Sequence, residues 1–353
     1  MDSVLTAMVE DRIGPGDYSK AIIQSAKEHL HFDFAVALRS PATALRLALT
    51  ALSPEDGDGV LVSALSPRYY AQVLAEMRLA PLHCDVGSLS FPCLTPESVE
   101  KAISARPADV QPRCVLLHHT LGFMPDTASI AALGIPVIDD ISQSYSPAPG
   151  DVAGEGQAAG NSDGAGEAPK PPAREATRGA LAFLGLEERD MLTSGGGALL
   201  FAMNRRDASA LRGYSGLPPE YCLPDINAAL AGVQFRELER NMERRREIAR
   251  VYAQASLRTR HKRFVPLDGF AYNDYAFALV LESSMRDVVA YARKKEIAVE
   301  SAFAGSLAGT GAVDSALCPV SHSLSLRTAL FPMYPRLRSA ETERVSKLIM
   351  TLP

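Results

Sequence analysis

The sequence lacks three features that would assign it to common protein classes. Its longest apolar stretches, such as Ala35–Leu38 and Ala198–Met203, are far shorter than the roughly 20 residues that a membrane-spanning helix needs. Residues 1–16 are interrupted by charges, so we expect neither a signal peptide nor a membrane anchor. Basic residues are not in excess, because the formal net charge is -5, and this argues against nucleic-acid binding. We therefore expect a cytoplasmic protein with no membrane or nucleic-acid partner.

Cysteine is scarce and widely spaced. The five thiols are odd in number and form no CxxC pair: Cys84, Cys93, Cys114, Cys222 and Cys318. This pattern argues against a disulfide framework and against a zinc site. We expect reduced, mostly buried thiols and no metal centre.

The sequence has enough apolar material for a large core, since 47% of its 353 residues are hydrophobic, and we expect two domains. Up to residue 140, short apolar segments typical of strands alternate with segments of helical spacing. The predicted strands are 34–38, 60–62, 81–85, 114–118 and 135–140, and the predicted helices are 18–30, 44–52, 67–78, 95–104 and 126–133. Because these strands lack polar alternation, they predict a mostly parallel sheet covered by helices on both faces.

Residues 146–178 interrupt this alternation. The segment is rich in Gly, Ala, Pro, Glu and Asp, and it has too few large apolar side chains to form a core, so we expect a mobile loop. Beyond it the pattern predicts strands at 179–183 and 198–203, a long helix over 225–254, and a smaller α/β unit. That unit has predicted strands at 275–281 and 297–300 and predicted helices at 285–295 and 339–350.

Six segments, taken in order, resemble the motifs of the DegT–StrS family of sugar aminotransferases. They lie at 35–49, 118–130, 137–143, 193–197, 225–245 and 324–335, so the resemblance covers nearly the whole chain. It implies the fold type I architecture of pyridoxal-phosphate enzymes. The large domain would be an aspartate aminotransferase-like, three-layer α/β/α domain over residues 1–235, and a smaller C-terminal α/β domain would follow over 236–353.

The resemblance also implies a chemistry. Family members are homodimers that use pyridoxal phosphate to transfer an amino group from glutamate to a nucleotide-linked keto sugar. A lysine forms the Schiff base, an aspartate pairs with the pyridine nitrogen, and a helix N-terminus binds the phosphate. By this resemblance Asp140 is the pyridine partner and Gln143 lies beside the ring oxygen. Ser40, Thr43 and Ser194 are the other candidate cofactor-binding residues. The alternative for Asp140 is that it only caps the loop after a buried strand.

The lysine required by this chemistry is missing. Counting back from Gly196-Gly197 places its position at Arg189, within one or two residues, and no lysine occurs between Lys170 and Lys262. A guanidinium stays protonated and forms no stable aldimine, and the neighbouring carboxylates of Glu187, Glu188 and Asp190 form none either. We therefore assign no catalytic residue, and we expect that any pyridoxal phosphate would bind non-covalently.

Other motif positions also differ from the family. Pro41 and Ala42 remove a backbone donor and a hydroxyl from the phosphate loop, and Glu220 would repel a phosphate. The position of the ring-stacking aromatic residue falls close to Pro67, with Tyr69 and Tyr70 nearby.

Two further motifs have more than one interpretation. The glycines at 195–197 are either a turn kept for its backbone geometry, which we favour, or a remnant of close cofactor approach. His118 and His119 could serve metal binding or acid–base chemistry. Without a second ligand pair we favour packing at a strand end with solvent exposure.

Three functions remain open. The first is a catalytically degenerate homologue that acts as a binding or scaffolding subunit in nucleotide-sugar or polysaccharide metabolism, as a homodimer or as a heterodimer with an active relative. The second is an aminotransferase or sugar-modifying enzyme that uses the cofactor without this lysine. The third is a nucleotide-sugar sensor. The missing lysine, the altered phosphate loop and Glu220 all favour the first.

Overall fold

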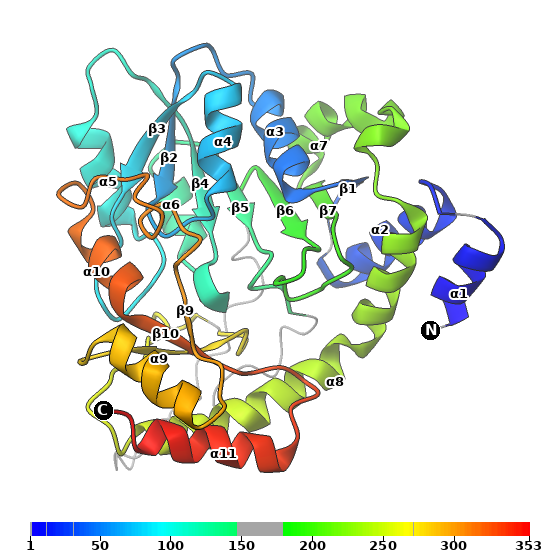
Figure 1. Ribbon diagram of the computed structural model, residues 1–353. Helices are drawn as coiled ribbons and strands as arrows, with labels where there is room; N and C mark the ends of the chain where they lie inside the picture. The colour runs from blue at the N-terminus through cyan, green and yellow to red at the C-terminus, as the bar shows by residue number, and fades with distance from the viewer. Residues whose placement is uncertain (1, 12, 31, 147–178, 271) are drawn as a thin grey trace, which may run out of the picture.

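A computed structural model describes residues 2–11, 13–30, 32–146, 179–270 and 272–353 (Figure 1). Residues 147–178, nearly all of the segment expected to be a mobile loop, lie outside this range. The described residues form one seven-stranded sheet and one three-stranded sheet. The large sheet contains β1 (Phe34–Leu38), β2 (Gly59–Ser63), β3 (Ala80–Cys84), β4 (Pro112–His118), β5 (Val137–Asp140), β6 (Leu181–Gly185) and β7 (Ala198–Ala202).

The large sheet has the strand order β1-β7-β6-β5-β4-β2-β3. The pairings from β3 through β6 are parallel, whereas β7 runs antiparallel to both of its neighbours. Four of its strands, β2, β5, β6 and β7, are buried along their whole length, which explains why the sequence shows no period-2 polarity there. The mostly parallel sheet predicted from the sequence is confirmed.

Helices cover both faces of this sheet, so the three-layer arrangement is also confirmed (Figure 1). One face packs on α3 (Pro41–Ala51), α4 (Tyr69–Glu76) and α7 (Arg205–Leu211). The other face packs on α2 (Asp17–Leu30), α5 (Pro96–Ala105), α6 (Thr127–Ala131) and the first half of α8 (Asp225–Ser256). Alternate residues of each strand enter opposite layers: Val60 and Val62 join the first core, whereas Leu61 joins the second.

The long helix α8 connects the two sheets. Its first half packs against α2, and its second half packs against α11 (Ser339–Met350). The small sheet has the antiparallel order β8-β10-β9, formed by β8 (Phe277–Val280), β9 (Glu300–Ser301) and β10 (Thr328–Phe331), with α9 (Met285–Lys294) packed on the same core. The domain boundary expected at 235/236 falls inside α8, which is one continuous helix, and it remains a prediction.

Several elements were not predicted from the sequence: α1 (Asp2–Val9), α7, α10 (Pro319–Arg327) and β10. Strand β10 was missed because it is only four residues long and follows α10 directly. Its extended form comes from pairing with β8 and β9, which lie 48 and 27 residues before it at Val280 and Ser301. The extended conformation of β10 therefore depends on pairing with distant strands and not on local strand propensity.

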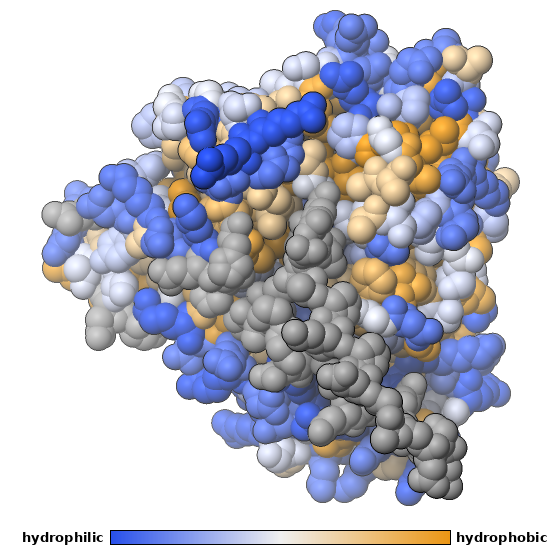
Figure 2. All heavy atoms as spheres, turned by 180° about the vertical axis from the view of Figure 1, so that it is seen from behind, coloured by the Kyte–Doolittle hydropathy of each residue, from blue (hydrophilic) through white to orange (hydrophobic). Residues whose placement is uncertain are grey.

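The cysteines are free thiols; all except Cys222 are buried, as expected. Among the helices of the described residues, none is long and apolar enough to cross a membrane. On the face turned away from the view of Figure 1, apolar residues form separate patches among hydrophilic ones (Figure 2).

The three glycines at 195–197 all have positive φ, at 74°, 134° and 121°. A Cβ atom on Gly197 would also overlap the Leu223 side chain. Because side chains disfavour this backbone region, the turn interpretation of the motif has direct geometric support. The loop therefore needs glycine whether or not a ligand approaches it.

We predict that Gly197→Ala lowers the free energy of unfolding by roughly 2 kcal/mol or more, because it adds backbone strain and a steric overlap. The measurement is chemical denaturation followed by circular dichroism. Gly213→Ala is the control, since Gly213 has open space around it and should change stability by less than about 0.5 kcal/mol. Equal effects of the two changes would contradict the strained-turn explanation.

Candidate cofactor site and adjoining cleft

The polar residues singled out by the family motifs lie at the carboxyl ends of the parallel strands. Asp140 ends β5 and His118 ends β4, while Tyr70 lies on α4, just beyond β2. The loop 186–193 follows β6, the next strand in the sheet. Since the carboxyl ends of parallel strands meet at one edge, these residues from distant parts of the sequence form a single site.

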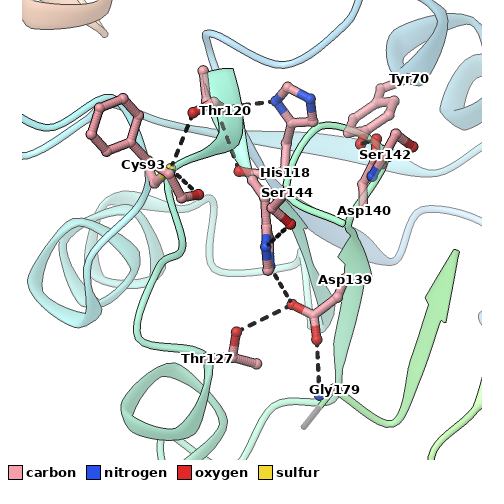
Figure 3. Close-up of polar contacts among 12 residues, drawn as sticks. Tyr70, Cys93, His118, Thr120, Thr127, Asp139, Asp140, Ser142, Ser144 and Gly179 are labelled. Atoms are coloured by element: carbon pink, nitrogen blue, oxygen red, sulfur yellow. Dashed lines mark hydrogen bonds and ion pairs between the residues drawn. The ribbon is translucent and has the colours of Figure 1, made fainter. Parts of the chain in front are cut away.

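Asp140 is buried, with 2% of its surface exposed, and both of its carboxylate oxygens accept hydrogen bonds from the protein (Figure 3). The Tyr70 hydroxyl donates to Oδ2 at 2.5 Å. The Ser142 backbone N–H donates to Oδ1 at 3.0 Å, and the Ser142 hydroxyl donates to the same oxygen. Three donors suit a charged carboxylate and compensate for its burial.

Tyr70 is itself fully buried. Burial, followed by the nearby charge of Asp140, raises the pKa of the Tyr70 phenol well above its ordinary value. The phenol therefore keeps its proton and remains a donor to Asp140. Sequence reasoning had noted Tyr70 only as a neighbour of the ring-stacking position. Its contact with Asp140 depends on the packing of α4 against the sheet, which no local motif encodes.

Arg189 does not face Asp140. Its guanidinium lies at the surface and forms an ion pair with Glu300, with 2.9 Å between the nitrogen and the oxygen. The next residue, Asp190, is the one that turns inward: its Oδ2 accepts the Glu187 N–H at 2.8 Å. A Cβ atom on Gly185 would overlap that oxygen and would lie 2.8 Å from the Ser142 hydroxyl that binds Asp140. Within the one- or two-residue uncertainty of the counting, the loop turns Asp190, which is half-buried, and Met191, which is buried, away from solvent, and neither side chain is an amine.

Asp190 is half-buried and lies near enough to the buried Asp140 for their charges to interact. Burial first, and then repulsion from the Asp140 carboxylate, raise the pKa of Asp190 from 3.8 to about 7. The backbone N–H of Glu187 opposes this shift only in part. At neutral pH the Asp190 carboxyl group is thus near half-protonation, which reduces the repulsion between two adjacent carboxylates.

The remaining candidate cofactor residues bond to the chain itself. The Gln143 side-chain oxygen accepts the N–H of Leu121 at 2.7 Å. The Ser40 hydroxyl caps its own helix, α3, by accepting the Thr43 N–H at 3.2 Å, and the two hydroxyls lie 3.0 Å apart. The Ser194 hydroxyl donates to the Gly196 carbonyl at 2.9 Å. Ser40 and Thr43 lie together at the start of α3, as expected from the motif.

The expectation that His118 and His119 are solvent-exposed is wrong, since they are only 5% and 2% exposed. The His119 ring bonds to the Ser144 hydroxyl at 2.7 Å through Nδ1 and to Asp139 at 3.2 Å through Nε2 (Figure 3). Asp139 also accepts the Gly179 N–H and the Thr127 hydroxyl. These bonds join the ends of β4 and β5 to α6 and to the start of β6, so the network supports the chain beneath Asp140. The sequence could not show it because its members come from four separate segments.

The geometry does not fit pyridoxal phosphate in the way the motifs imply. The Asp140 carboxylate, which would pair with the pyridine nitrogen, already has both oxygens bonded to protein donors. A second acid, Asp190, takes the inward position of the loop in which the lysine was sought. Pro41, which has no N–H, begins α3, and the Thr43 N–H is already bonded to Ser40. A ring and a phosphate would each have to displace contacts that the protein makes with itself.

A cleft of about 950 Å³ opens beside this site. It is bounded by the loop 188–193, the middle of α8, Tyr275 and the segment 330–336. Asp190 lies on its wall, whereas Asp140, Ser40, Thr43 and Gln143 do not line it. The cleft thus reaches the candidate site from the side of the loop, and the Asp140 carboxylate remains buried away from it.

A family model for the DegT/DnrJ/EryC1/StrS aminotransferase family matches residues 1–162 and 201–350. The chain belongs to this family. The unmatched stretch between the two parts contains Arg189, Asp190 and the three glycines, where the sequence departs most from the motifs.

Individual relatives cover almost all of the chain. A dTDP-4-dehydro-2,3,6-trideoxy-D-glucose 4-aminotransferase from Saccharopolyspora spinosa is 24% identical over 98% of this chain and 92% of the relative. A DegT/DnrJ/EryC1/StrS aminotransferase structure from Brucella abortus has a TM-score of 0.80 and 20% identity, covering 99% and 93% of the two chains. An E. coli GDP-4-keto-6-deoxy-D-mannose-3-dehydratase with bound hydrated pyridoxal phosphate has a TM-score of 0.77 and 13% identity, covering 99% and 95%. The fold predicted from the motifs is confirmed.

We predict that Asp190→Asn makes stability less dependent on pH. A carboxyl group whose pKa rises from 3.8 to about 7 on folding contributes most stability below its unfolded pKa, and that contribution is lost as the pH rises through about 4 to 7. Asparagine keeps an acceptor for the Glu187 N–H but never carries the charge. The variant should therefore melt at a higher temperature than the wild type at pH 8, and the two should melt alike near pH 4.

The control for this measurement is Asp207→Asn, since Asp207 is at the exposed start of α7. Thermal melts by circular dichroism from pH 4 to pH 8 compare the two variants with the wild type. A wild-type advantage over Asp190→Asn at pH 8 would show that the charged carboxylate stabilises the site, contrary to this account.

Proposed function

We propose that this chain is a DegT/DnrJ/EryC1/StrS family member that forms no internal aldimine and acts as a binding or scaffolding homologue in nucleotide-sugar or polysaccharide metabolism. The proposal rests on the hydrogen bonds that Asp140 already makes with the protein. Its carboxylate is bonded to Tyr70 and Ser142, and the loop beside it contributes Asp190, an acid, where the chemistry needs an amine.

A second candidate is an enzyme that acts on a nucleotide-linked keto sugar with glutamate as amino donor, or one that uses pyridoxal phosphate without this lysine. Two observations favour it. The relative from Saccharopolyspora spinosa is a sugar 4-aminotransferase, and the E. coli dehydratase structure of the same fold holds hydrated pyridoxal phosphate. This candidate requires Tyr70 to leave Asp140 when the cofactor arrives.

We predict that the purified protein, mixed with pyridoxal phosphate and reduced with borohydride, yields no pyridoxyl-lysine peptide. The reason is that no lysine lies between Lys170 and Lys262, a range that includes the whole loop beside Asp140. Peptide mass mapping is the measurement, and an active aminotransferase of the family serves as the positive control. A stoichiometric adduct on one lysine would overturn the proposal. Saturable cofactor binding without an adduct would support the second candidate instead.

We also propose a homodimer, or a heterodimer with a family relative. The N-terminal region supports this, because four of its large apolar side chains are half or more exposed: Leu5, Met8, Val9 and Ile13. Exposed apolar side chains gathered in one segment are typical of surfaces that become buried on association.

We predict that light scattering of the wild type at low micromolar concentration gives a dimer mass, and that Leu5→Asp with Val9→Asp shifts it towards the monomer. A matched control is Val265→Asp, since Val265 is 55% exposed but lies elsewhere in the chain. A monomer mass for the wild type would remove the homodimer, and failure to co-purify a family relative from native cells would then remove the heterodimer.

A further inference from the structure

The cleft beside the candidate site contains polar groups that the chain does not use. Arg245 lies on α8 at its inner wall, and its Nη1 donates to the carbonyls of Tyr275 at 2.7 Å and Met333 at 3.0 Å. These two bonds hold the guanidinium in place, while its Nε and Nη2 have no hydrogen-bond acceptor among the described residues. A guanidinium fixed in this way is a pre-organised donor, since little side-chain freedom is left to lose on binding.

Three other polar side chains line the cleft without a partner in the described part of the chain: Gln234, Asn241 and Arg336. Gln234 and Asn241 are only partly exposed, and they lie two turns of α8 apart. The cleft is also lined by apolar side chains that are partly exposed, Val233, Tyr275 and Leu330. The cleft thus combines convergent donors with an apolar surface, as small-molecule sites usually do.

Two guanidinium groups of the cleft have no ion-pair partner among the described residues. Arg189 is neutralised by Glu300 at 2.9 Å, and Arg240 by Glu237 at 2.6 Å. Arg244 pairs with Glu247, which does not line the cleft. Arg245 and Arg336 form no ion pair within 4 Å in the described part of the chain, and neither do the two remaining acids of the cleft, Glu188 and Asp190. Asp190, whose pKa is raised to about 7 by burial and then by the Asp140 charge, is only partly ionised at neutral pH.

Burial of Arg245 reinforces this argument. Desolvation lowers the pKa of its guanidinium, and the charge of Asp274 offsets this only in part. A partly desolvated cation is stabilised by an anion that binds against it more strongly than an exposed cation would be.

From this arrangement we propose that the cleft binds a small organic anion, in which a carboxylate or phosphate contacts Arg245 and Arg336 and an apolar or aromatic body lies on Val233, Tyr275 and Leu330. The inference rests on the proposed function, since it names the ligand chemistry of a binding homologue. It assigns a recognition role to Arg245, Arg336 and Asn241, and it requires neither cofactor nor lysine.

The experiment is isothermal titration calorimetry of the full-length protein with phenyl phosphate, benzoate and inorganic phosphate. Phenyl phosphate or benzoate should bind more tightly than inorganic phosphate, because only the first two bury an aromatic body against the apolar wall. Whichever of phenyl phosphate and benzoate binds more tightly shows whether the site prefers a phosphate or a carboxylate. Arg336→Ala should weaken that binding at least about fivefold, the effect of losing one charge-assisted contact, and Asn241→Ala should weaken it less.

Arg258→Ala is the charge-matched control, since Arg258 is exposed, forms no ion pair among the described residues and lies outside the cleft. It should leave the dissociation constant within about twofold. Equal losses of affinity in the Arg258 and Arg336 variants would show that only the net charge of the protein matters, and would overturn the proposal. Absence of heat with all three probes at millimolar concentration would overturn it as well.

Failure of this inference differs from failure of the proposed function. A pyridoxyl-lysine adduct after borohydride treatment would reject the non-covalent, non-catalytic role and leave the titrations unaffected. Titrations without heat, combined with no adduct, would reject only the anion site. The Arg336 side chain is exposed and makes no hydrogen bond or ion pair among the described residues. Its variant should therefore fold, and circular dichroism checks that it does.

Discussion

The hydrogen bond between Tyr70 and Asp140 is the contact on which the character of the site depends. A buried carboxylate must be compensated, and here the protein supplies all the donors itself: a phenol from α4 and a backbone N–H and hydroxyl from the residue two positions after the strand. Because the compensation is internal, the strand end is complete without a ligand. The carboxylate that the family motif assigns to the cofactor therefore has its hydrogen bonds satisfied by the protein itself in this structure.

The neighbouring residues follow from the same constraint. A lysine beside Asp140 would add an opposite charge, but this loop turns Asp190 inward and Arg189 outward. Burial first, and then repulsion from the Asp140 carboxylate, raise the pKa of Asp190, so it takes up a proton more readily than an exposed aspartate does. Arg189 instead joins the loop to Glu300 of the small sheet. The loop thus links the two sheets at the mouth of the cleft.

The cleft and the enclosed site differ in how well their polar groups are satisfied. Around Asp140, His119 and Asp139, the polar side chains bond to each other or to the backbone. Around Arg245, guanidinium N–H groups have no acceptor among the described residues, and apolar side chains such as Val233 and Leu330 line the same cleft. A binding surface is expected where donors are fixed but unpaired, since a ligand there replaces water without displacing protein contacts. Within this family member, recognition has a better structural basis in the cleft than at the strand ends.

The sequence alone determined the architecture and the family. Buried runs such as Val60–Val62 and the spacing of 225–254 predicted the sheet and the long helix, because apolar periodicity is a local property of the chain. It also determined that no lysine occurs between Lys170 and Lys262, the stretch that contains the loop after β6. Only the tertiary structure decided that Arg189 points outward to Glu300 while Asp190 is half-buried, that Tyr70 bonds to Asp140, and that the two histidines are buried. Those facts depend on contacts between residues 20 or more positions apart in the sequence, and contacts over that separation leave no local sequence pattern.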